Sequence, residues 1–216
     1  MGKTEMKDLI IIGAGDVGKY IAYHFSILPE FRVIGFLDDD KSKLGNYYAN
    51  YPVLGDLTYL KQIKEISIAI GIANPIIKQK IFNNIKYISG LEFPNLIHPN
   101  SWIGEKVTFG KGNIIYPGTM INYETKIGDF VTVNMNCAIG HNCNIENFGT
   151  LSPGVNLGGF THIGESSFIG IGANTIQSTK IGSQCTIGGG SMIIKDVPDG
   201  CIVVGNPGRV IKKMDI

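Results

Sequence analysis

The chain has 216 residues, a formal net charge of +1 and 17% charged residues. This balance excludes the basic face that binding to nucleic acid or an anionic membrane demands, and no apolar run approaches the roughly 20 residues of a membrane span. The segment from Met1 to Lys7 is polar and carries both signs, unlike a secretory or transit peptide. We therefore expect a cytoplasmic protein that binds neither nucleic acid nor a membrane.

The first predicted element is a buried strand at residues 8–12, which runs into a loop containing Gly13, Gly15 and Gly18. An amphipathic helix follows through about Leu28. In this G-x-G-x-x-G arrangement the glycines let the backbone approach a phosphate, and the helix N-terminus presents N–H groups to the anion. A tight turn that binds nothing has the same local pattern, so the loop alone is a weak indication of nucleotide binding.

A second predicted strand, Phe31–Leu37, ends in the aspartates Asp38, Asp39 and Asp40. They lie about 20 residues beyond Gly18, where a Rossmann domain places the carboxylate that binds a ribose hydroxyl. We expect Asp38 and Asp39 to contact the ribose or the base. The loop and the aspartates together predict a nucleotide site.

The rest of the N-terminal half alternates between predicted strands and helices. Asn74 supplies an N-cap and Pro75 a proline in the first helical turn. We expect half of a doubly wound α/β domain, a half-Rossmann domain, over residues 1–92. The segments expected are a loop at Leu44–Gly55, a helix near Leu57–Lys64, a strand at Ile66–Ile72 and a helix from Pro75 to about Ile85.

From Ile97 to Ile193 every sixth residue is apolar, with Thr175 as the one exception, and the residue two places before each is small or nearly so. A six-residue period is the signature of a parallel β-helix. Each hexad supplies a short strand and a turn, and stacked coils lie roughly 4.8 Å apart. We therefore expect an all-β parallel β-helix over residues 93–216, with bulky residues of the tail from Val203 capping its open end.

Three of the four cysteines, Cys137, Cys143 and Cys185, occupy the small inward position of the repeat. Cysteine at such a position packs as a small hydrophobe. There is no Cys-His spacing typical of zinc sites. We expect core packing for these residues and neither a metal site nor a disulfide.

Two histidines fall within the repeat, His141 and His162, and a histidine at such a place is usually an ordinary surface residue. His141 differs because its hexad lies in a polar stretch of sequence that contains Asn134, Asn136, Asn144 and Glu146. An imidazole titrates near neutral pH, which suits a general base. His141 is therefore the candidate catalytic residue.

Several features together resemble the NeuD/PglD-type family of bacterial sugar acyltransferases, which modify sialic acids or nucleotide-linked amino sugars. They are the glycine loop, the Leu-Asp-Asp strand end, an Asn-Leu-Ile-His-Pro junction at residues 95–99, an I-x-H-x-C-x-I element around His141 and a Gly-Asn-Pro tail. The resemblance covers nearly the whole chain. It implies a left-handed β-helix, a nucleotide-sugar-binding N-terminal domain, a homotrimer with active sites between adjacent subunits, and acetyl-CoA as donor.

The resemblance implies that His141 is the catalytic base and that Asn134 lies near it. The next residue in the family is usually acidic and orients the ring, whereas this chain has Asn142. An amide can hold the ring by a hydrogen bond but adds no charge. We expect Glu146 or a residue of a neighbouring chain to compensate, or else a weaker base.

The acetyl-CoA groove implied by the resemblance is lined largely by backbone. Thr150 stands where some members carry a second histidine near the acyl donor. The histidine common in the family's glycine loop is absent here. We therefore expect the nucleotide or the sugar to differ from that of the family members that carry this histidine. The matching positions for acetyl-CoA are Thr150, Gly159, Ile171, Gly189 and Pro207.

The first hypothesis is an acetyl-CoA-dependent N-acetyltransferase acting on a nucleotide-linked amino sugar. His141 would accept a proton as the amine attacks the thioester, and the backbone N–H of Gly159 would stabilise the oxyanion. The alternatives are O-acetylation of a sugar hydroxyl, as in sialic acid, and a non-catalytic trimeric module that binds a nucleotide. A nicotinamide-dependent oxidoreductase is disfavoured because no dehydrogenase catalytic domain follows the glycine loop. The nucleotide, UDP, dTDP or GDP, is left open.

Overall fold

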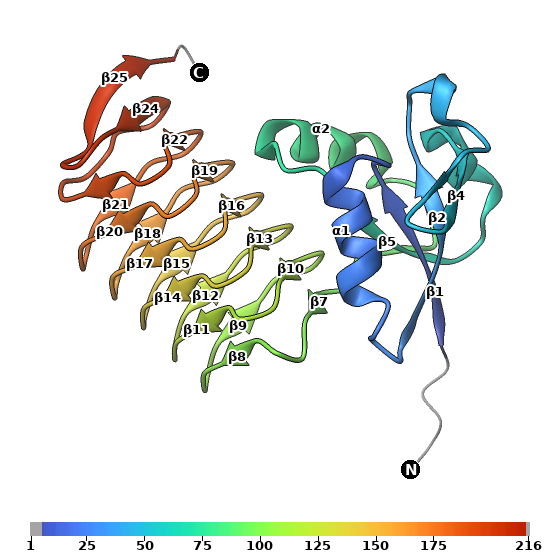
Figure 1. Ribbon diagram of the computed structural model, residues 1–216, viewed down its shortest axis with the longest axis horizontal. Coiled ribbons are helices and arrows are strands. Elements are labelled where there is room, and N and C mark those ends of the chain that lie inside the picture. The colour runs from blue at the N-terminus through green and yellow to red at the C-terminus, as the bar shows by residue number, and fades with distance from the viewer. Residues whose placement is uncertain (1–5, 215–216) are drawn as a thin grey trace. The chain divides into compact units, whose positions relative to one another are not determined.

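The computed structural model describes residues 6–214 and divides into two compact units (Figure 1). The first contains the described residues up to 73 together with 80–94, and the second contains 74–79 together with the described residues from 95 onward. Residues 1–5, on which the expected absence of a targeting peptide partly rests, lie outside the described residues. No helix within the described part of the chain has the length and apolar character needed to cross a membrane.

The first unit is an α/β layer built on a six-stranded sheet of order β3-β4-β2-β1-β5-β6. All neighbouring strands are parallel except the β3–β4 hairpin. The central strand β1 and its neighbour β5 are buried over most of their length, as parallel strands covered on both faces must be. The strands are β1 (Lys7–Ile12), β2 (Phe31–Leu37), β3 (Tyr47–Tyr48), β4 (Tyr51–Gly55), β5 (Ile66–Ile70) and β6 (Leu91–Glu92), and the helices are α1 (Asp16–Phe25), α2 (Pro75–Ile85) and the short 3₁₀ helices η1 (Lys41–Lys43) and η2 (Leu57–Gln62).

The sequence predicted the order of these elements and some of their bounds. Strand β2 and helix α2 have the predicted bounds, and Asn74 caps α2, with its Oδ1 accepting the N–H of Ile77 at 3.1 Å. Helix α1 ends at Phe25 rather than Leu28, and β5 ends at Ile70 rather than Ile72.

The helix expected near Leu57–Lys64 is present as the 3₁₀ helix η2. One prediction in this unit was wrong, because the loop expected at Leu44–Gly55 contains strands β3 and β4. Strand β4 escaped notice because only its central residue, Val53, is fully buried, so the segment lacks the run of apolar residues that marks an interior strand.

The second unit is the expected β-helix, in which two-residue strands from successive coils stack in parallel into three sheets, until β24 and β25 end the chain (Figure 1). We name the sheets by their first strands. The β7 sheet contains β7 (Leu96–Ile97), β10 (Ile114–Ile115), β13 (Thr132–Val133), β16 (Thr150–Leu151), β19 (Phe168–Ile169), β22 (Thr186–Ile187), β24 (Cys201–Val204) and β25 (Arg209–Lys213). The β8 sheet contains β8 (Trp102–Ile103), β11 (Met120–Ile121), β14 (Ala138–Ile139), β17 (Asn156–Leu157), β20 (Asn174–Thr175) and β23 (Met192–Ile193). The β9 sheet contains β9 (Thr108–Phe109), β12 (Lys126–Ile127), β15 (Asn144–Ile145), β18 (His162–Ile163) and β21 (Lys180–Ile181).

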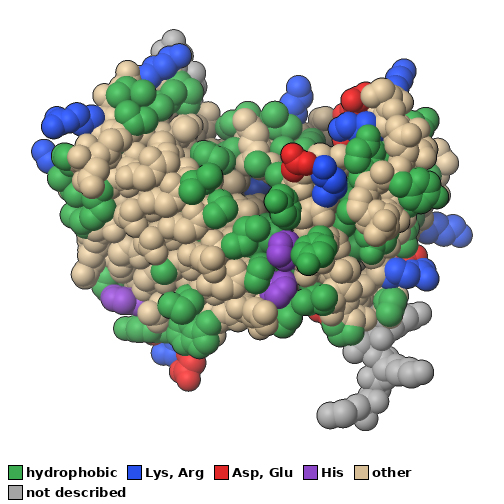
Figure 2. All heavy atoms as spheres, viewed as in Figure 1, with side chains coloured by type: hydrophobic (Ala, Val, Ile, Leu, Met, Phe, Trp, Pro, Cys, Tyr) green, Lys and Arg blue, Asp and Glu red, His purple; other side chains and the backbone are tan. Residues whose placement is uncertain are grey.

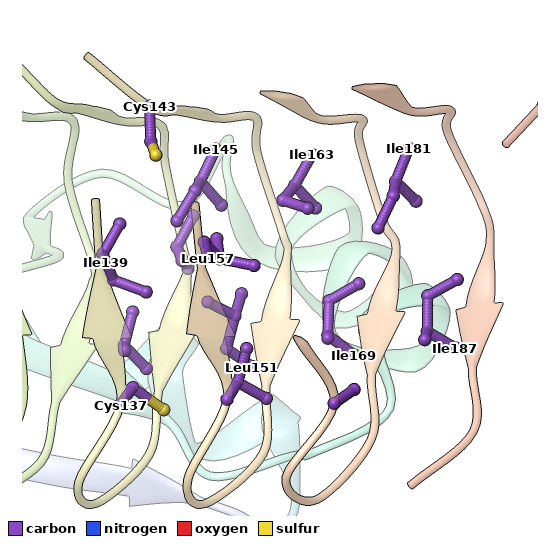
Figure 3. Packing of buried hydrophobic residues seen from close by; sticks show 14 of the residues in the cluster. Cys137, Ile139, Cys143, Ile145, Leu151, Leu157, Ile163, Ile169, Ile181 and Ile187 are labelled. Carbon is purple, nitrogen blue, oxygen red and sulfur yellow. The ribbon is translucent and has the colours of Figure 1, made fainter. Parts of the chain in front are cut away.

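The sixth-residue positions fill the interior of the coils, as predicted (Figure 3). Each fully buried aliphatic side chain contributes about 1.5–3 kcal/mol, so this column is the main source of stability. The polar exception, Thr175, is also buried, and its Oγ1 lies 2.8 Å from Oγ1 of Thr161 and accepts the N–H of Gly158 at 3.0 Å. A polar group in the core is thus satisfied by a second polar group and by backbone.

All four cysteines are buried, which confirms the predicted packing of Cys137, Cys143 and Cys185 in the core. Burial raises the pKa of the Cys137 and Cys143 thiols to about 11. Within residues 6–214 no three His, Cys, Asp or Glu side chains are grouped so that they could hold a metal ion.

The tail closes the coils differently from the expectation that its bulky residues form a cap. Strand β24 pairs in parallel with β22 and buries Val203, and β25 returns antiparallel to β24. Val210 and Ile211 in β25 are exposed in the single chain, so the core is closed by Cys201 and Val203 of β24 rather than by β25.

Candidate functional site

The predicted base, His141, lies at a corner of the coil between the β8 sheet and the β9 sheet, because β14 ends at Ile139 and β15 begins at Asn144. Residues 18 apart occupy equivalent places in successive coils, as the hydrogen bond between Glu124 and Asn142 illustrates. We call this edge of the coils the His141 corner. At this corner Tyr123 lies one coil before His141 and Gly159 one coil after it, because each is 18 residues away.

Aromatic rings hold the imidazole in place. The Tyr123 ring lies parallel to it, with centroids 5.5 Å apart and planes 10° apart. The Phe160 ring meets it edge-on, with centroids 5.0 Å apart and planes at 84°. The half-buried imidazole therefore has a fixed plane, which a general base needs for directed proton transfer.

A chain of polar contacts leads away from the imidazole. Nδ1 of His141 lies 2.9 Å from Oδ1 of Asn142, and Nδ2 of Asn142 donates to Oε2 of Glu124 at 2.9 Å. The other oxygen of Glu124, Oε1, lies 3.1 Å from Nζ of Lys106. The hydrogen bonds from Asn142 and Lys106 and the charge of Lys106 lower the pKa of the Glu124 carboxyl, so this group is an anion at neutral pH.

The second ring nitrogen lies beside Gly159. Nε2 of His141 has no hydrogen-bond partner within the described residues. A β-carbon on Gly159 would lie 2.7 Å from it, so glycine at this position keeps the approach to Nε2 free. Within residues 6–214 the backbone N–H of Gly159 also donates no hydrogen bond.

The backbone just before Gly159 is held from inside the coil. The carbonyl of Gly158 accepts the hydroxyl of Thr161 at 2.7 Å, and its N–H donates to Oγ1 of Thr175 at 3.0 Å. Thr175, the polar residue among the buried sixth-residue positions, thus lies beside the His141 corner. There it holds the peptide that leads to Gly159.

A shallow groove of about 500 Å³ runs along the β8 sheet next to this corner. Its walls are mostly apolar side chains, with glycine backbone at the corner itself. The residues that line it include Trp102, Met120, Asn122, Gly140, Gly158 and Met192.

Other predicted residues lie at a different corner. Asn134 directly follows β13, and Ile171 and Gly189 follow β19 and β22, so all three lie where the β7 sheet turns into the β8 sheet. A single chain therefore does not bring them to His141. Pro207 lies between β24 and β25.

Thr150 is buried in β16 and its hydroxyl is already engaged. Its Oγ1 accepts a hydrogen bond from Nζ of Lys78 at 3.2 Å. Lys78, in the part of α2 that belongs to the β-helical unit, also donates to the carbonyl of Phe130 at 3.0 Å and to Oγ1 of Thr132 at 2.9 Å. Burial lowers the pKa of this lysine to about 7.

The expectation that Glu146 compensates for the missing acidic neighbour is wrong. Glu146 lies in another corner, where Oε1 is 3.1 Å from Nε2 of His162 and Oε2 accepts the N–H of Glu165 at 3.0 Å. The carboxylate connected to His141 is Glu124 instead. Sequence reasoning missed Glu124, Tyr123 and Phe160, although writing the repeat in rows of 18 residues places them directly beside His141 and Asn142.

The glycine loop of the first unit has the backbone that a phosphate site requires. A β-carbon on Gly18 would overlap the carbonyl oxygen of Gly13, so only glycine fits there. A β-carbon on Gly15 would meet nothing within 4 Å, which leaves that side of the loop open. Helix α1 begins at Asp16, and no side chain of its N-cap residue, Gly15, competes for the N–H groups of its first turn, which have no partner within the helix.

Asp38 and Asp39 line a cavity of about 170 Å³ next to this loop, together with apolar residues such as Ile12, Leu37 and Leu57. Asp38 is occupied by the protein: it accepts the N–H of Ala14 at 2.9 Å, the N–H of Asp40 at 3.0 Å and Nζ of Lys43 at 2.8 Å. Burial alone raises the pKa of Asp38, but these hydrogen bonds outweigh it and the pKa is lowered. Asp39 is exposed.

Comparisons with known proteins give the same architecture. A family model for the PglD N-terminal domain matches residues 8–85. The acetyltransferase domain of PglB from Neisseria gonorrhoeae FA1090, in complex with acetyl coenzyme A, is 33% identical with a TM-score of 0.89, and the match covers 95% of this chain and 100% of that one.

Two further solved structures are similar over nearly their whole length. A mutant of perosamine N-acetyltransferase from Caulobacter crescentus, in complex with CoA and GDP-perosamine, is 25% identical with a TM-score of 0.90, covering 98% of this chain and 100% of that one. WeeI from Acinetobacter baumannii AYE is 28% identical with a TM-score of 0.82, covering 94% of this chain and 99% of that one.

One curated protein is similar over a shorter stretch. The redox-sensing transcriptional repressor Rex 1 from Thermotoga maritima is 34% identical over 73 residues, which are 32% of this chain and 34% of that protein. The chain thus spans about a third of the length of this curated relative.

Proposed function

The chain belongs to the NeuD/PglD-type family of acetyl-CoA-dependent sugar acyltransferases, and we propose that it transfers the acetyl group to the amine of an amino sugar carried by a nucleotide. The observation that carries the proposal is Nε2 of His141, which has no hydrogen-bond partner among residues 6–214 and lies against the place that a side chain on Gly159 would fill. The relatives support it, since the PglB domain was solved in complex with acetyl coenzyme A and the C. crescentus enzyme in complex with CoA and GDP-perosamine.

The chemistry is a direct acyl transfer. Nε2 of His141 accepts a proton as the acceptor amine attacks the thioester carbon, and the thiol of CoA leaves from the tetrahedral intermediate. The backbone N–H of Gly159 stabilises the oxyanion of that intermediate. Cys143 takes no covalent part, because it is buried and burial raises its thiol pKa to about 11.

The first unit holds the nucleotide. The glycine loop and the N-terminus of α1 bind the diphosphate, and Asp39 contacts the ribose or the base from the wall of the cavity. Asp38 acts indirectly, since its hydrogen bonds to Ala14 and Lys43 shape the loop. Binding the nucleotide in this way orients the sugar amine for attack.

We further propose a homotrimer with active sites between subunits. The corner with His141 and Gly159 and the corner with Ile171 and Gly189 are different edges of the β-helix, so a neighbouring subunit is required to unite them. Phe160 and Ile171 are about half or more exposed in the single chain. The face of the coils seen in Figure 2 consists mainly of backbone and uncharged side chains, with several hydrophobic patches, which suits packing against another subunit. A cytoplasmic location, where acetyl-CoA is available, belongs to the same proposal.

The test is release of free thiol from acetyl-CoA in the presence of UDP-, dTDP- and GDP-linked amino sugars. We expect turnover with one class of amino sugar nucleotide and none with its hydroxyl analogue. Turnover with a hydroxyl acceptor alone would establish O-acetylation instead. Binding of the nucleotides without any thiol release would identify a non-catalytic module.

A further inference from the structure

We infer that Glu124 is a positioning residue for acetyl transfer, acting on His141 through the amide of Asn142. The inference rests on the proposed function for its catalytic consequence, and on geometry alone for the relay itself. The contacts join three side chains from two successive coils: Nδ1 of His141 to Oδ1 of Asn142 at 2.9 Å, and Nδ2 of Asn142 to Oε2 of Glu124 at 2.9 Å.

The carboxylate determines which way the amide points. An ionised carboxylate only accepts hydrogen bonds, so the NH₂ group of Asn142 must face Glu124 and its carbonyl oxygen must face His141. In the reverse orientation the amide oxygen would lie against a carboxylate oxygen and both would be acceptors. Lys106 keeps Glu124 in the charged form by its contact at 3.1 Å.

The orientation of the amide in turn determines the tautomer of the imidazole. A carbonyl oxygen facing Nδ1 requires that Nδ1 carry the proton, which leaves Nε2 with a lone pair. This is the form that can accept a proton from an acceptor amine. Without Glu124 the amide is free to rotate and donate to Nδ1, and the proton would then move to Nε2 and block the base.

The other groups around the ring do not perform this task. Tyr123 and Phe160 contact its face and edge and fix its plane, but neither accepts from Nδ1. A negative charge one coil away is therefore linked to His141 through the amide of Asn142. An isolated Asn142 would orient the ring without choosing its tautomer.

The direct test needs no substrate. ¹⁵N-histidine labelling gives four imidazoles, and His141→Gln assigns the one of interest. We expect the Nδ1–H tautomer in the wild-type protein and a mixture, or the Nε2–H form, in Glu124→Ala. The matched control is Glu105→Ala, which removes an exposed carboxylate from the same corner one coil earlier and should leave the tautomer unchanged. The same Nδ1–H tautomer in Glu124→Ala and the wild type would overturn the inference.

Kinetics supply a readout that a merely structural role would not give. Glu124→Ala should lower kcat about tenfold or more with little change in KM, as part of the 10²–10⁴-fold contribution of a general base is lost. In an Asn142→Asp background the aspartate accepts from Nδ1 directly and Glu124 becomes a repulsive neighbour. There Glu124→Ala should leave kcat unchanged or raise it. An equal loss of kcat on Glu124→Ala in both backgrounds would contradict the relay from Glu124 through Asn142 to His141. A wild-type protein without turnover would instead count against the proposed function. The tautomer measurement would then decide the relay by itself.

Discussion

Nε2 of His141 faces the place that a side chain on Gly159 would occupy, since a β-carbon there would lie 2.7 Å from it. Gly159→Ala should therefore push the ring out of position and obstruct the approach of the acceptor. Gly159 does not have a left-handed φ, so alanine strains no backbone there. We expect kcat to fall about 100-fold, comparable with the loss of one oxyanion-stabilising group, while the melting temperature changes by only a few degrees. Full activity in this variant would show that the reaction takes place elsewhere.

The two histidines of the repeat offer a matched pair. His141→Ala removes the proposed base and should lower kcat by about 10²–10⁴-fold, with CoA and nucleotide still bound. His162→Ala removes an imidazole whose two nitrogens lie 3.1 Å from Glu146 and 3.1 Å from Asn144, away from the His141 corner, so its kcat should stay within about twofold of the wild type. Steady-state kinetics with both substrates varied checks the pair. A similar loss in both variants would mean that His141 has no special role.

Particular residues show which features of the fold and the site could be predicted from the sequence. The six-residue period predicted the buried column from Ile115 to Ile193, because every coil buries the same position. The glycine loop, β2 and α2 were also predicted, because the residues within each of these segments determine its backbone conformation. The relay through Glu124 was not predicted, because Glu124 and Asn142 are neighbours only across successive coils. Glu146 is nearer to His141 in the sequence and was chosen for that reason. Asp38 was assigned to the ligand because the sequence does not reveal its bonds to Ala14 and Lys43.

The buried amine of Lys78 should make stability depend on pH. Its pKa in the folded protein is about 7, below the ordinary value of 10.5, so between these values the unfolded chain binds a proton that the folded chain does not. Raising the pH through this window therefore stabilises the folded state. Relative to Lys78→Met, the wild type should gain on the order of 2–3 kcal/mol between pH 7 and 9. Urea titrations at both pH values measure the difference.

Lys80→Met is the control for that comparison, because it removes an exposed lysine from the same helix. Its stability relative to the wild type should not change with pH. A difference between wild type and Lys78→Met that stays constant from pH 7 to 9 would show that Lys78 keeps its proton when buried.

The two aspartates beside the glycine loop should separate stability from binding. Asp38→Asn weakens the hydrogen bonds to Ala14, Asp40 and Lys43 and should cost about 1–3 kcal/mol of folding stability. Asp39→Asn alters an exposed carboxylate on the cavity wall and should leave stability unchanged while weakening nucleotide binding about tenfold. Thermal melts and calorimetric titration with UDP, dTDP and GDP check both. Unchanged affinity in Asp39→Asn would remove it from the proposed site.

The most direct measurement for acetyl transfer by His141 is mass spectrometry of UDP-, dTDP- and GDP-amino sugars incubated with acetyl-CoA and the protein. With the wild type we expect one of them to gain the mass of a single acetyl group, located on the amine by fragmentation, and with His141→Ala we expect the product to be reduced at least 100-fold. An acetylated product formed equally fast by His141→Ala would contradict the account.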